Sequence, residues 1–411
     1  MTDGGAGRPP TGALAALRRI PRGVWLLGFV SLLMDASSEL VHALLPLFMV
    51  GVLGASALAV GLIEGAAEAT ALVVKVFSGY WSDRLRKRAP LVLTGYGLAA
   101  VSKVAIALAP ALSWIVAARI ADRIGKGIRG APRDALITDI TPAEVRGASF
   151  GLRQALDTVG AIVGPLLALA AMAWFAGDFR AALWVAVVPA ALCVLLIVVG
   201  VRDPPETAKG DAKPPIAMAD VKRLDRRFWL ITGIAAVLTL ARFSEAFLIL
   251  RGQNVGMTAF TAPWVMVALA VVYTLGAFPA GAWADRGGAT PSLYLGLAAL
   301  IAADLVLANA TNAAWVLVGA GLWGLHMALT QGLLSALVAA VAPDDLRGTA
   351  FGVFNLVSGV ALLAASALAG LLWDTVGPAA TFIAGAAFTM LAAVGFTIAR
   401  HYGMALPKLR G

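Results

Sequence analysis

Charged residues and cysteine are scarce in this chain. Asp, Glu, Lys and Arg together make up 13% of the 411 residues, which is about half the fraction usual in soluble globular proteins. A single cysteine, Cys193, excludes a framework of intramolecular disulfides and a thiolate metal centre. Because there are also only three histidines, the sequence predicts no metal site and no cofactor.

Signatures of catalysis are missing as well. Gly125-Lys126-Gly127 lacks the spacing of a phosphate-binding loop and is not followed by serine or threonine. No nucleophile with a histidine and an acid, and no zinc-binding histidine pair, stands in a plausible context. We therefore expect that the protein is not an enzyme, and that any work it performs draws on an ion gradient.

Apolar residues, by contrast, make up 60% of the chain, more than a soluble protein of this length can bury. They fall into runs that are each near the roughly 20 residues needed to cross a bilayer. The runs predict an all-α membrane protein with twelve transmembrane helices. Their expected ranges are 24–50, 57–81, 90–109, 113–137, 147–172, 181–201, 228–250, 260–283, 290–309, 313–338, 348–373 and 378–400.

The basic residues indicate how such helices would be oriented. Most Lys and Arg side chains fall in short loops, which indicates membrane topology rather than a groove for nucleic acid. They gather before the first helix, between the second and third, and in residues 202–227, whereas the opposite side has only Arg180 and Arg251. We expect a multi-pass protein of the inner (plasma) membrane, surrounded by the lipid bilayer, with both termini cytoplasmic and no nucleic-acid partner.

Two short segments recur in the second half of the chain. Residues 79–84 (GYWSDR) return as 281–286 (GAWADR), and residues 146–151 (RGASFG) return as 347–352 (RGTAFG). Both repeats are about 200 residues apart, which indicates a duplicated unit of six helices. The predicted parts are a disordered cytoplasmic amino terminus (1–22), two pseudo-symmetric six-helix bundles (23–201 and 228–400), a cytoplasmic linker (202–227) and a cytoplasmic tail (401–411).

The first repeat resembles a loop motif of the major facilitator superfamily. Gly79-x-x-x-Asp83-Arg84-x-x-x-Arg88 is similar to the motif between helices 2 and 3 of that family, although Arg86 stands where glycine is common. Gly281-x-x-x-Asp285-Arg286 is similar to its counterpart in the second half. The resemblance covers the whole chain and implies two six-helix bundles around a central site.

In this family the loop motif would act as a conformational latch. The resemblance places Asp83 near the positive end of helix 11, where a carboxylate is favoured by about 0.3–1 kcal/mol. The latch would hold the outward-open state. The alternative is a solvated carboxylate in a turn that only anchors the topology. The latch residues implied are Gly79, Asp83, Arg84, Arg88, Gly281, Asp285 and Arg286.

Two further motifs resemble the drug/proton antiporter branch of the superfamily. Gly151, Gly160, Gly164 and Pro165 follow the spacing of its helix-5 motif, but Ala168-Leu169 stand where two glycines are usual. Arg123-x-x-Lys126-Gly127 is similar to its helix-4 motif, with Lys126 in place of glutamine. Glycines one turn apart permit close helix approach, and Pro165 favours a bend. Ordinary packing is the alternative role for all four positions.

Charged side chains recur inside the predicted helices, where they are costly and therefore face the protein interior or a water-filled cavity. Many are spaced three or four residues apart and so share a helix face. Candidates for proton coupling are Asp35, Glu39, Glu64, Glu68 and Asp157. Candidates for lining a substrate cavity are His42, Lys103, Arg119, Asp122, Arg123, Lys126, Arg153, Arg242, Glu245, Asp304, His326 and Asn355.

Three interpretations of these charges stay open, and they can coexist. Acids on the first two helices would bind and release protons, bases on the fourth would contact an anionic or zwitterionic solute, or the charges would form a static lattice of ion pairs. We predict a secondary active transporter with alternating access, functional as a monomer. Its partners would be protons and a small molecule, exported by antiport. The alternatives are proton-coupled uptake of an anionic or zwitterionic solute, and a non-transporting receptor or assembly factor.

Overall fold

The computed structural model describes residues 17–85, 87–204, 216, 218–330 and 332–401, and all its regular segments are helical. The predicted disordered amino terminus and the cytoplasmic tail lie largely outside these residues, as do residues 205–215 and 217 of the predicted linker. The long helices are α2 (Arg22–Gly51), α3 (Ala57–Leu85), α4 (Arg88–Leu108), α5 (Leu112–Ile140), α6 (Arg146–Trp174), α12 (Trp264–Trp283), α13 (Ala289–Ala308), α16 (Arg347–Thr375) and α17 (Pro378–His401).

The other predicted spans consist of two consecutive helices each. These pairs are α7 (Phe179–Val185) with α8 (Val187–Gly200), α10 (Arg226–Ala241) with α11 (Ala246–Asn254), and α14 (Ala313–Thr330) with α15 (Leu333–Val341). The last pair is separated at Gly332, whose φ of +89° is readily adopted only by glycine. Short elements are η1 (Ala143–Val145), α9 (Met218–Val221), η2 (Ala284–Gly288) and η3 (Asp344–Leu346).

Ten helical stretches of the described residues are long and apolar enough to cross a bilayer. This number differs from the predicted twelve for two physical reasons. Helix α5 carries too many charges to be counted by composition. Helices α12 and α13 are joined through the π-helical turn η2 into one stretch, Trp264–Ala308. Each predicted range nevertheless falls on one helix or on a pair of consecutive helices.

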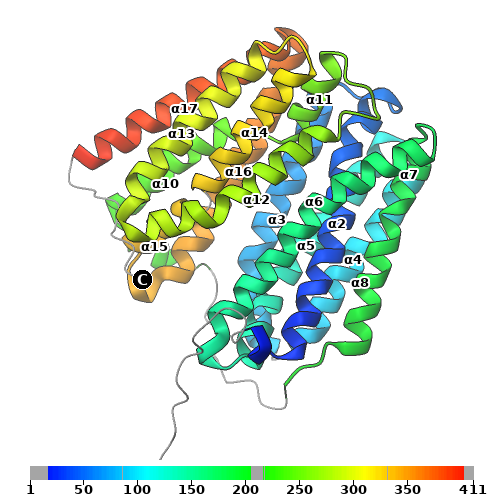
Figure 1. The fold of residues 1–411 in the computed structure, drawn as a ribbon. Coiled ribbons are helices and arrows are strands. Elements are labelled where there is room, and N and C mark those ends of the chain that lie inside the picture. Colours follow the sequence, from blue (N-terminus) through cyan, green and yellow to red (C-terminus); the bar gives the residue numbers. More distant parts are fainter. Residues whose placement is uncertain (1–16, 86, 205–215, 217, 331, 402–411) are drawn as a thin grey trace, which may run out of the picture.

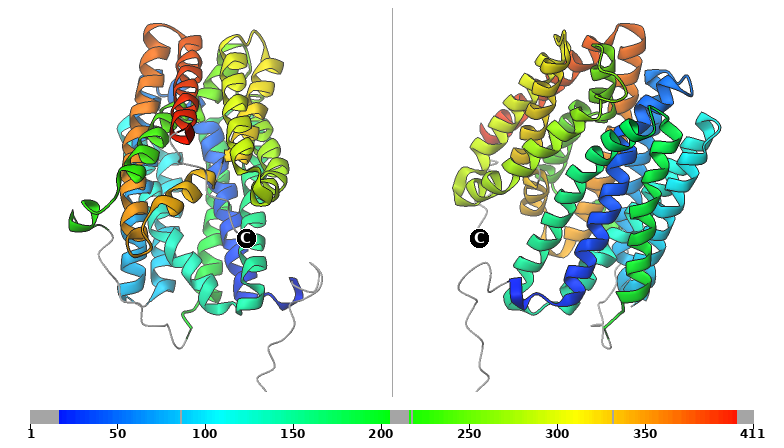
Figure 2. Two further views of the ribbon diagram at one scale, coloured as in Figure 1. Left: turned by 90° about the vertical axis from the view of Figure 1, so that its left-hand side faces the viewer. Right: turned by 45° about the vertical axis from the view of Figure 1, so that its right-hand side comes forward.

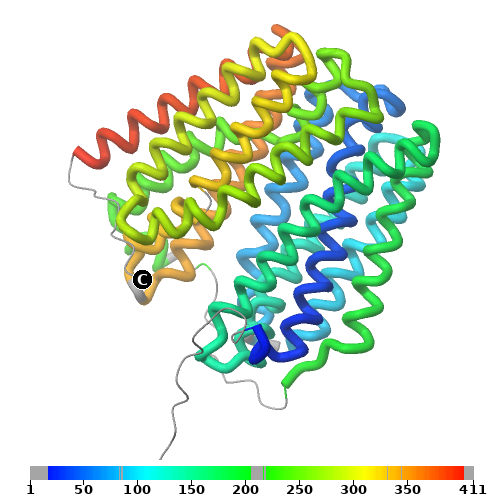
Figure 3. Tube along the Cα trace, in the orientation of Figure 1, coloured from blue at the N-terminus to red at the C-terminus, as the bar shows by residue number. Residues whose placement is uncertain are grey.

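The helices form two groups in space (Figures 1 and 2). The first group, α2 to α8, lies together on one side, and the second group, α10 to α17, lies on the other. The Cα trace in Figure 3 shows the same division along the chain. Contacts between the groups are made mainly by α3 with α16, α6 with α12, and α2 with α11.

Helices α3 and α16 are held together where α3 begins and α16 ends. The carboxylate of Asp374, on α16, accepts hydrogen bonds from the backbone N–H groups of Ala57 (3.1 Å) and Leu58 (2.9 Å). One group therefore caps a helix of the other. A Cβ on Gly370 would lie 2.5 Å from the Ala57 oxygen, so the absence of a side chain permits this close approach.

Removing this cap should loosen the contact between the groups. Loss of an N-cap carboxylate costs about 0.5–2 kcal/mol, and in Asp374→Ala that cost falls on the state in which α3 and α16 meet. We expect longer distances between spin labels placed on the beginning of α3 and the end of α16. Asp178→Ala is the matched control, because Asp178 caps α7 within its own group. Equal distance changes in both variants would contradict this role for Asp374.

Candidate functional site

A cavity of about 400 Å³ lies between the two groups of helices. Its volume is within the range of sites for small molecules. Both acidic and basic side chains contribute to its wall. The lining residues are Glu39, His42, Glu68, Leu72, Arg123, Lys126, Thr239, Arg242, Phe243, Ser244, Glu245, Trp323 and Leu362.

The second group contributes an unusual segment to this wall. Helix α10 ends at Ala241 and α11 begins at Ala246, and all four residues between them line the cavity. Four successive residues of a continuous helix would point in all directions around its axis. The interruption therefore allows Arg242, Phe243, Ser244 and Glu245 to face one space. Ser244 N–H donates to Ser366 Oγ of α16 at 3.1 Å, which fixes the segment to a neighbouring helix.

One contact between polar side chains crosses the cavity from group to group. Nε2 of His42, on α2, lies 3.4 Å from Oε2 of Glu245 in the interrupted segment. Nδ1 of the same ring lies 4.0 Å from Glu64. In the wall formed by the first group, Nη2 of Arg123 lies 2.9 Å from Oε1 of Glu68. The cavity therefore holds opposite charges in contact, and a charged solute would compete with these pairs.

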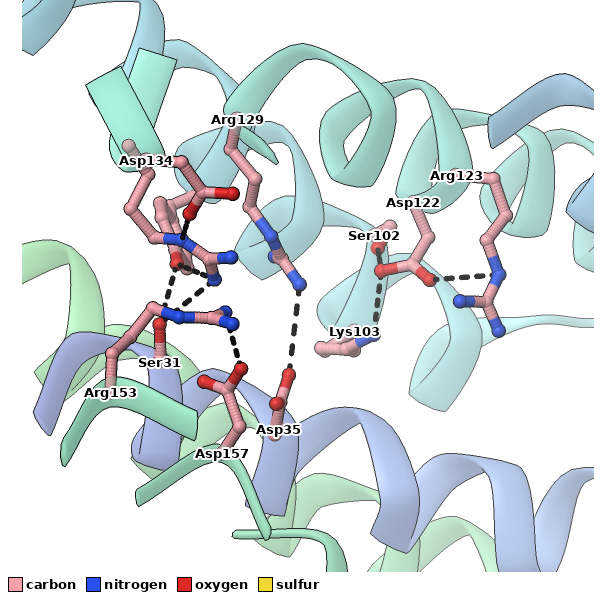
Figure 4. A network of polar contacts seen from close by, with 12 residues as sticks. Ser31, Asp35, Ser102, Lys103, Asp122, Arg123, Arg129, Asp134, Arg153 and Asp157 are labelled. Atoms are coloured by element: carbon pink, nitrogen blue, oxygen red, sulfur yellow. Dashed lines mark hydrogen bonds and ion pairs between the residues drawn. The ribbon is translucent and has the colours of Figure 1, made fainter. Parts of the chain in front are cut away.

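Deeper in the first group lies a sealed network of charges (Figure 4). Asp122 accepts from Lys103 Nζ at 2.6 Å and from Ser102 Oγ at 3.3 Å, as Figure 4 shows. Its carboxylate also lies 3.5 Å from Nη1 of Arg119. Arg119 in turn donates to both oxygens of Glu64. Glu64, Lys103, Arg119 and Asp122 are each at most 2% exposed. Such a network has the form of the ion-pair lattice that the sequence suggests as one interpretation of the charges. These four side chains do not line the cavity.

A second charged cluster lies around α2, α5 and α6 (Figure 4). Arg153 donates to Asp157 at 2.6 Å, and Arg129 lies 3.9 Å from Asp35. The guanidinium of Arg129 also stacks over the ring of Tyr96, 4.4 Å from its centroid. Asp35 keeps about a third of its side chain exposed (33%), whereas Asp157 is more buried (14%). Neither aspartate lines the cavity in this conformation.

The remaining cavity candidates belong to the second group. His326 is fully buried, and its Nδ1 lies 2.8 Å from the Gly296 carbonyl oxygen. Asp304 is fully buried too, and neither of its oxygens has a hydrogen-bond donor among the described residues. Asn355 is partly buried on α16. These three residues lie outside the cavity lining, in which the second group is represented by Arg242 and Glu245 of the candidates.

The loop motifs lie at junctions between helices. The backbone of Asp83 belongs to α3, but its side chain lies outside the part of the chain that the structure describes. Arg84 donates to the Tyr80 hydroxyl at 2.7 Å, and Arg88 pairs with Asp139. Asp285, Arg286 and the neighbouring Gly287 (φ +96°) form the tight turn between α12 and α13. Gly281 is the last but two residue of α12.

The helix-5 motif packs against α2. A Cβ on Gly160 would lie 2.6 Å from the Leu32 carbonyl oxygen, and one on Gly164 would lie 2.6 Å from Cβ of Glu39. Gly151 has no atom within 4 Å of such a position. Pro165 lies within α6, which continues past it to Trp174. Two of the three glycines therefore lie in close contact with α2, and the third does not.

Several residues of the site carried no signal in the sequence. Phe243 and Ser244 line the cavity from the interrupted segment, and Thr239 lines it from the last turn of α10. The interrupted segment contains neither glycine nor proline, the usual marks of a helix break. Among the described residues, no three His, Cys, Asp or Glu side chains lie together so as to hold a metal ion.

Comparison with known proteins agrees with this architecture. A profile described as Major Facilitator Superfamily matches residues 25–251 and 241–403. The chain belongs to the Major Facilitator Superfamily. An uncharacterized MFS-type transporter of Methanocaldococcus jannaschii is 31% identical over 382 residues, which cover 91% of this chain and 94% of that protein. The protein is thus a multi-pass membrane transporter and not an enzyme.

More distant similarities involve part of the chain or the fold alone. The multidrug resistance protein MdtH of Photorhabdus laumondii is 32% identical over 147 residues, or 35% of this chain and 36% of that one. The crystal structure of a bacterial homologue of the human lysosomal transporter Spinster, inward-facing and unoccupied, superimposes with a TM-score of 0.69 at 17% identity. It covers 92% of this chain and 96% of that chain. The chain thus shares its fold with a solved structure of low sequence identity.

Proposed function

We propose that this transporter exports a small solute in exchange for protons by alternating access. The observation that carries the proposal is the cavity between the two groups, whose wall contains acids from α2 and α3 and is crossed by the His42–Glu245 contact. Acids beside a solute site can carry protons, and a pair that joins the groups can be broken as they separate. Both are requirements of coupled alternating access.

The proposed topology has twelve crossings. It adds α5 to the apolar stretches and divides Trp264–Ala308 at the turn η2. Two six-helix bundles, 23–201 and 228–400, would then be joined by a cytoplasmic linker at 202–227. The excess of basic residues in the linker and in the loop between α3 and α4 favours cytoplasmic termini in the inner (plasma) membrane. One chain contains both bundles, which supports function as a monomer.

Export by antiport has two supports. The glycine spacing of α6 is similar to that of drug/proton antiporters, and part of the chain is similar to a multidrug resistance protein. We place this transporter in that branch on these grounds. The loop residues Asp83 and Asp285 would act as latches at the cytoplasmic ends of the bundles, and their release would accompany each switch of conformation.

Uptake of an anionic or zwitterionic solute with protons is the second candidate. It is favoured by three basic side chains in the cavity wall, those of Arg123, Lys126 and Arg242. Direction separates the two candidates. In vesicles with an acid interior, antiport of an added solute carries protons out and raises the internal pH. Symport carries protons in together with the solute and lowers the internal pH. A panel of cationic, anionic and zwitterionic solutes, followed with an internal pH dye, tests both.

Among the acids, Glu39 is the one we expect to matter most for coupling, because it lines the cavity near His42. Glu39→Gln should transport solute down its own gradient but should lose most solute-dependent proton movement in proteoliposomes. Asp134→Asn is the control, because Asp134 pairs with Arg133 at 3.1 Å and is 45% exposed. A wild-type protein that moves no protons with any solute between pH 5 and 8 would remove the proposed function. Equal coupling in both variants would remove only the role of Glu39.

A further inference from the structure

Asp304 differs from every other deeply buried acid in the described residues. Glu64 and Asp122 are 1% and 2% exposed, and each has basic partners within hydrogen-bonding distance. Asp304, on α13, is 0% exposed, and both of its carboxylate oxygens lack a donor among the described residues. A charged carboxylate in such surroundings costs several kcal/mol. The neutral acid is therefore the form that this site accommodates.

The carboxyl group of Asp304 meets a glycine and an aromatic ring. A Cβ built on Gly385 of α17 would lie 2.7 Å from Oδ2 of Asp304 and 3.1 Å from the ring of Phe243. The carboxyl group of Asp304 and the ring of Phe243 therefore both border the space beside Gly385. Phe243 also lines the cavity between the groups. One aromatic side chain thus touches both the solute cavity and the surroundings of Asp304.

Among the residues that the structure describes, no charged side chain forms an ion pair or hydrogen bond with Asp304. His326 of α14 is anchored to Gly296, which precedes Asp304 by eight residues or about 12 Å along the helix. On α17, Arg400 lies 15 residues from Gly385, or about 22 Å. The other titratable groups of the neighbouring elements are Tyr273 of α12, Asp285 and Arg286 of η2, His401 of α17, and Arg242 and Glu245 beside Phe243.

Phe243 lies in the segment between α10 and α11 that is not helical. Its ring packs in an aromatic cluster, with centroids 5.3 Å from Trp323, 5.6 Å from Phe247 and 5.7 Å from Phe382. A segment without helical hydrogen bonds can change shape at lower cost than a continuous helix. A shift of this ring would open a path between Asp304 and the cavity.

We propose that Asp304 is a proton-binding site of the second group, which exchanges its proton with the cavity when Phe243 moves. The proposal rests on the proton coupling of the proposed function. The carboxyl group holds its proton in the conformation described here and releases it to water in the cavity in another. A second carrier, remote from the acids of α2 and α3, would then link protonation to the second group.

Infrared spectroscopy of the purified protein in lipid tests the first part directly. We expect the wild-type protein to show the C=O stretching band of a protonated carboxylic acid, shifted in heavy water. The band should be lost in Asp304→Asn and retained in Asp134→Asn. Asp304→Asn should melt at nearly the wild-type temperature, because a neutral side chain of the same shape replaces a neutral acid. Identical spectra of wild type and Asp304→Asn would overturn the proposal.

The gate has its own test. The band should exchange its proton for deuterium faster in Phe243→Ala than in wild type, and at the wild-type rate in Phe247→Ala. Phe247 is the matched control, because it is a buried member of the same cluster that does not line the cavity. Unchanged exchange in Phe243→Ala would reject the gate.

Transport then separates this inference from the proposed function. In proteoliposomes, Asp304→Asn should lose most of the proton movement that accompanies solute in wild type. If wild type moves protons and Asp304→Asn moves them equally well, the inference fails and the proposed function stands. If wild type moves none, the proposed function fails regardless of Asp304.

Discussion

Replacing Asp122 by leucine should destabilise the protein by about 3–5 kcal/mol, the usual cost of leaving a buried charge without its partner. Asp122 is the acceptor for Lys103 at 2.6 Å, and both side chains are fully enclosed in the first group. In Asp122→Leu the other neighbouring bases keep a carboxylate each, Arg119 that of Glu64 and Arg123 that of Glu68. The ammonium of Lys103 does not. Thermal melting in detergent measures the effect.

A second substitution should recover much of this loss. In Lys103→Met with Asp122→Leu, no ammonium is left without an acceptor, and apolar side chains of similar volume can replace a buried ion pair at little cost. The double variant should therefore melt above Asp122→Leu alone. Asp134→Leu is the control, since its partly exposed ion pair contributes about 0–1 kcal/mol. Additive losses in the double variant would show that Lys103 and Asp122 do not act as a pair.

Gly164→Ala should destabilise the contact between α2 and α6 by about 1–3 kcal/mol, the usual cost of overpacking a close interface. The new methyl would lie 2.6 Å from Cβ of Glu39, 2.7 Å from the Ala36 carbonyl oxygen and 2.9 Å from the Leu40 nitrogen. Two of these atoms are backbone, so the helices must separate. Because Glu39 lines the cavity, we expect weaker transport as well as a lower melting temperature.

Gly151→Ala provides the comparison within the same helix and the same motif. Its methyl would meet no atom within 4 Å, and alanine favours a helix over glycine by about 1 kcal/mol. We expect unchanged or slightly higher stability. If Gly151→Ala and Gly164→Ala were equally harmful, the glycines would be required for something other than helix approach.

The long apolar runs and the repeats are sufficient to predict an all-helical membrane protein and the approximate ranges of its long helices. The interruption between Ala241 and Ala246 could not be predicted, because its residues are compatible with a helix and are held by Ser366 from a distant part of the chain. The joining of α12 to α13 was missed for a similar reason. Its turn depends on Gly287 in a left-handed conformation, and the sequence motif there predicts a loop with latch residues but not a π-helical turn.

The spacing of the charged residues predicts which of them share a helix face, but it does not predict how deeply each side chain is buried. Arg119 and Arg123 are one turn apart on α5, yet Arg119 is sealed by Glu64 whereas Arg123 lines the cavity. The sequence groups Asp304 with the cavity residues, but in the structure it does not line the cavity, whereas the nearby Phe243 does. Such distinctions depend on which side chain of another helix lies opposite, and one sequence does not contain that information.

The cap that Asp374 provides for α3 lies at the surface. When this cap is broken, water can hydrogen-bond to the Asp374 carboxylate and to the freed backbone N–H groups, so no charge is left without a partner. The network around Asp122 is buried, so water cannot replace its hydrogen bonds in the same way. Contacts that break and re-form in each transport cycle would therefore be those that water can replace, whereas the buried contacts would stay formed throughout the cycle.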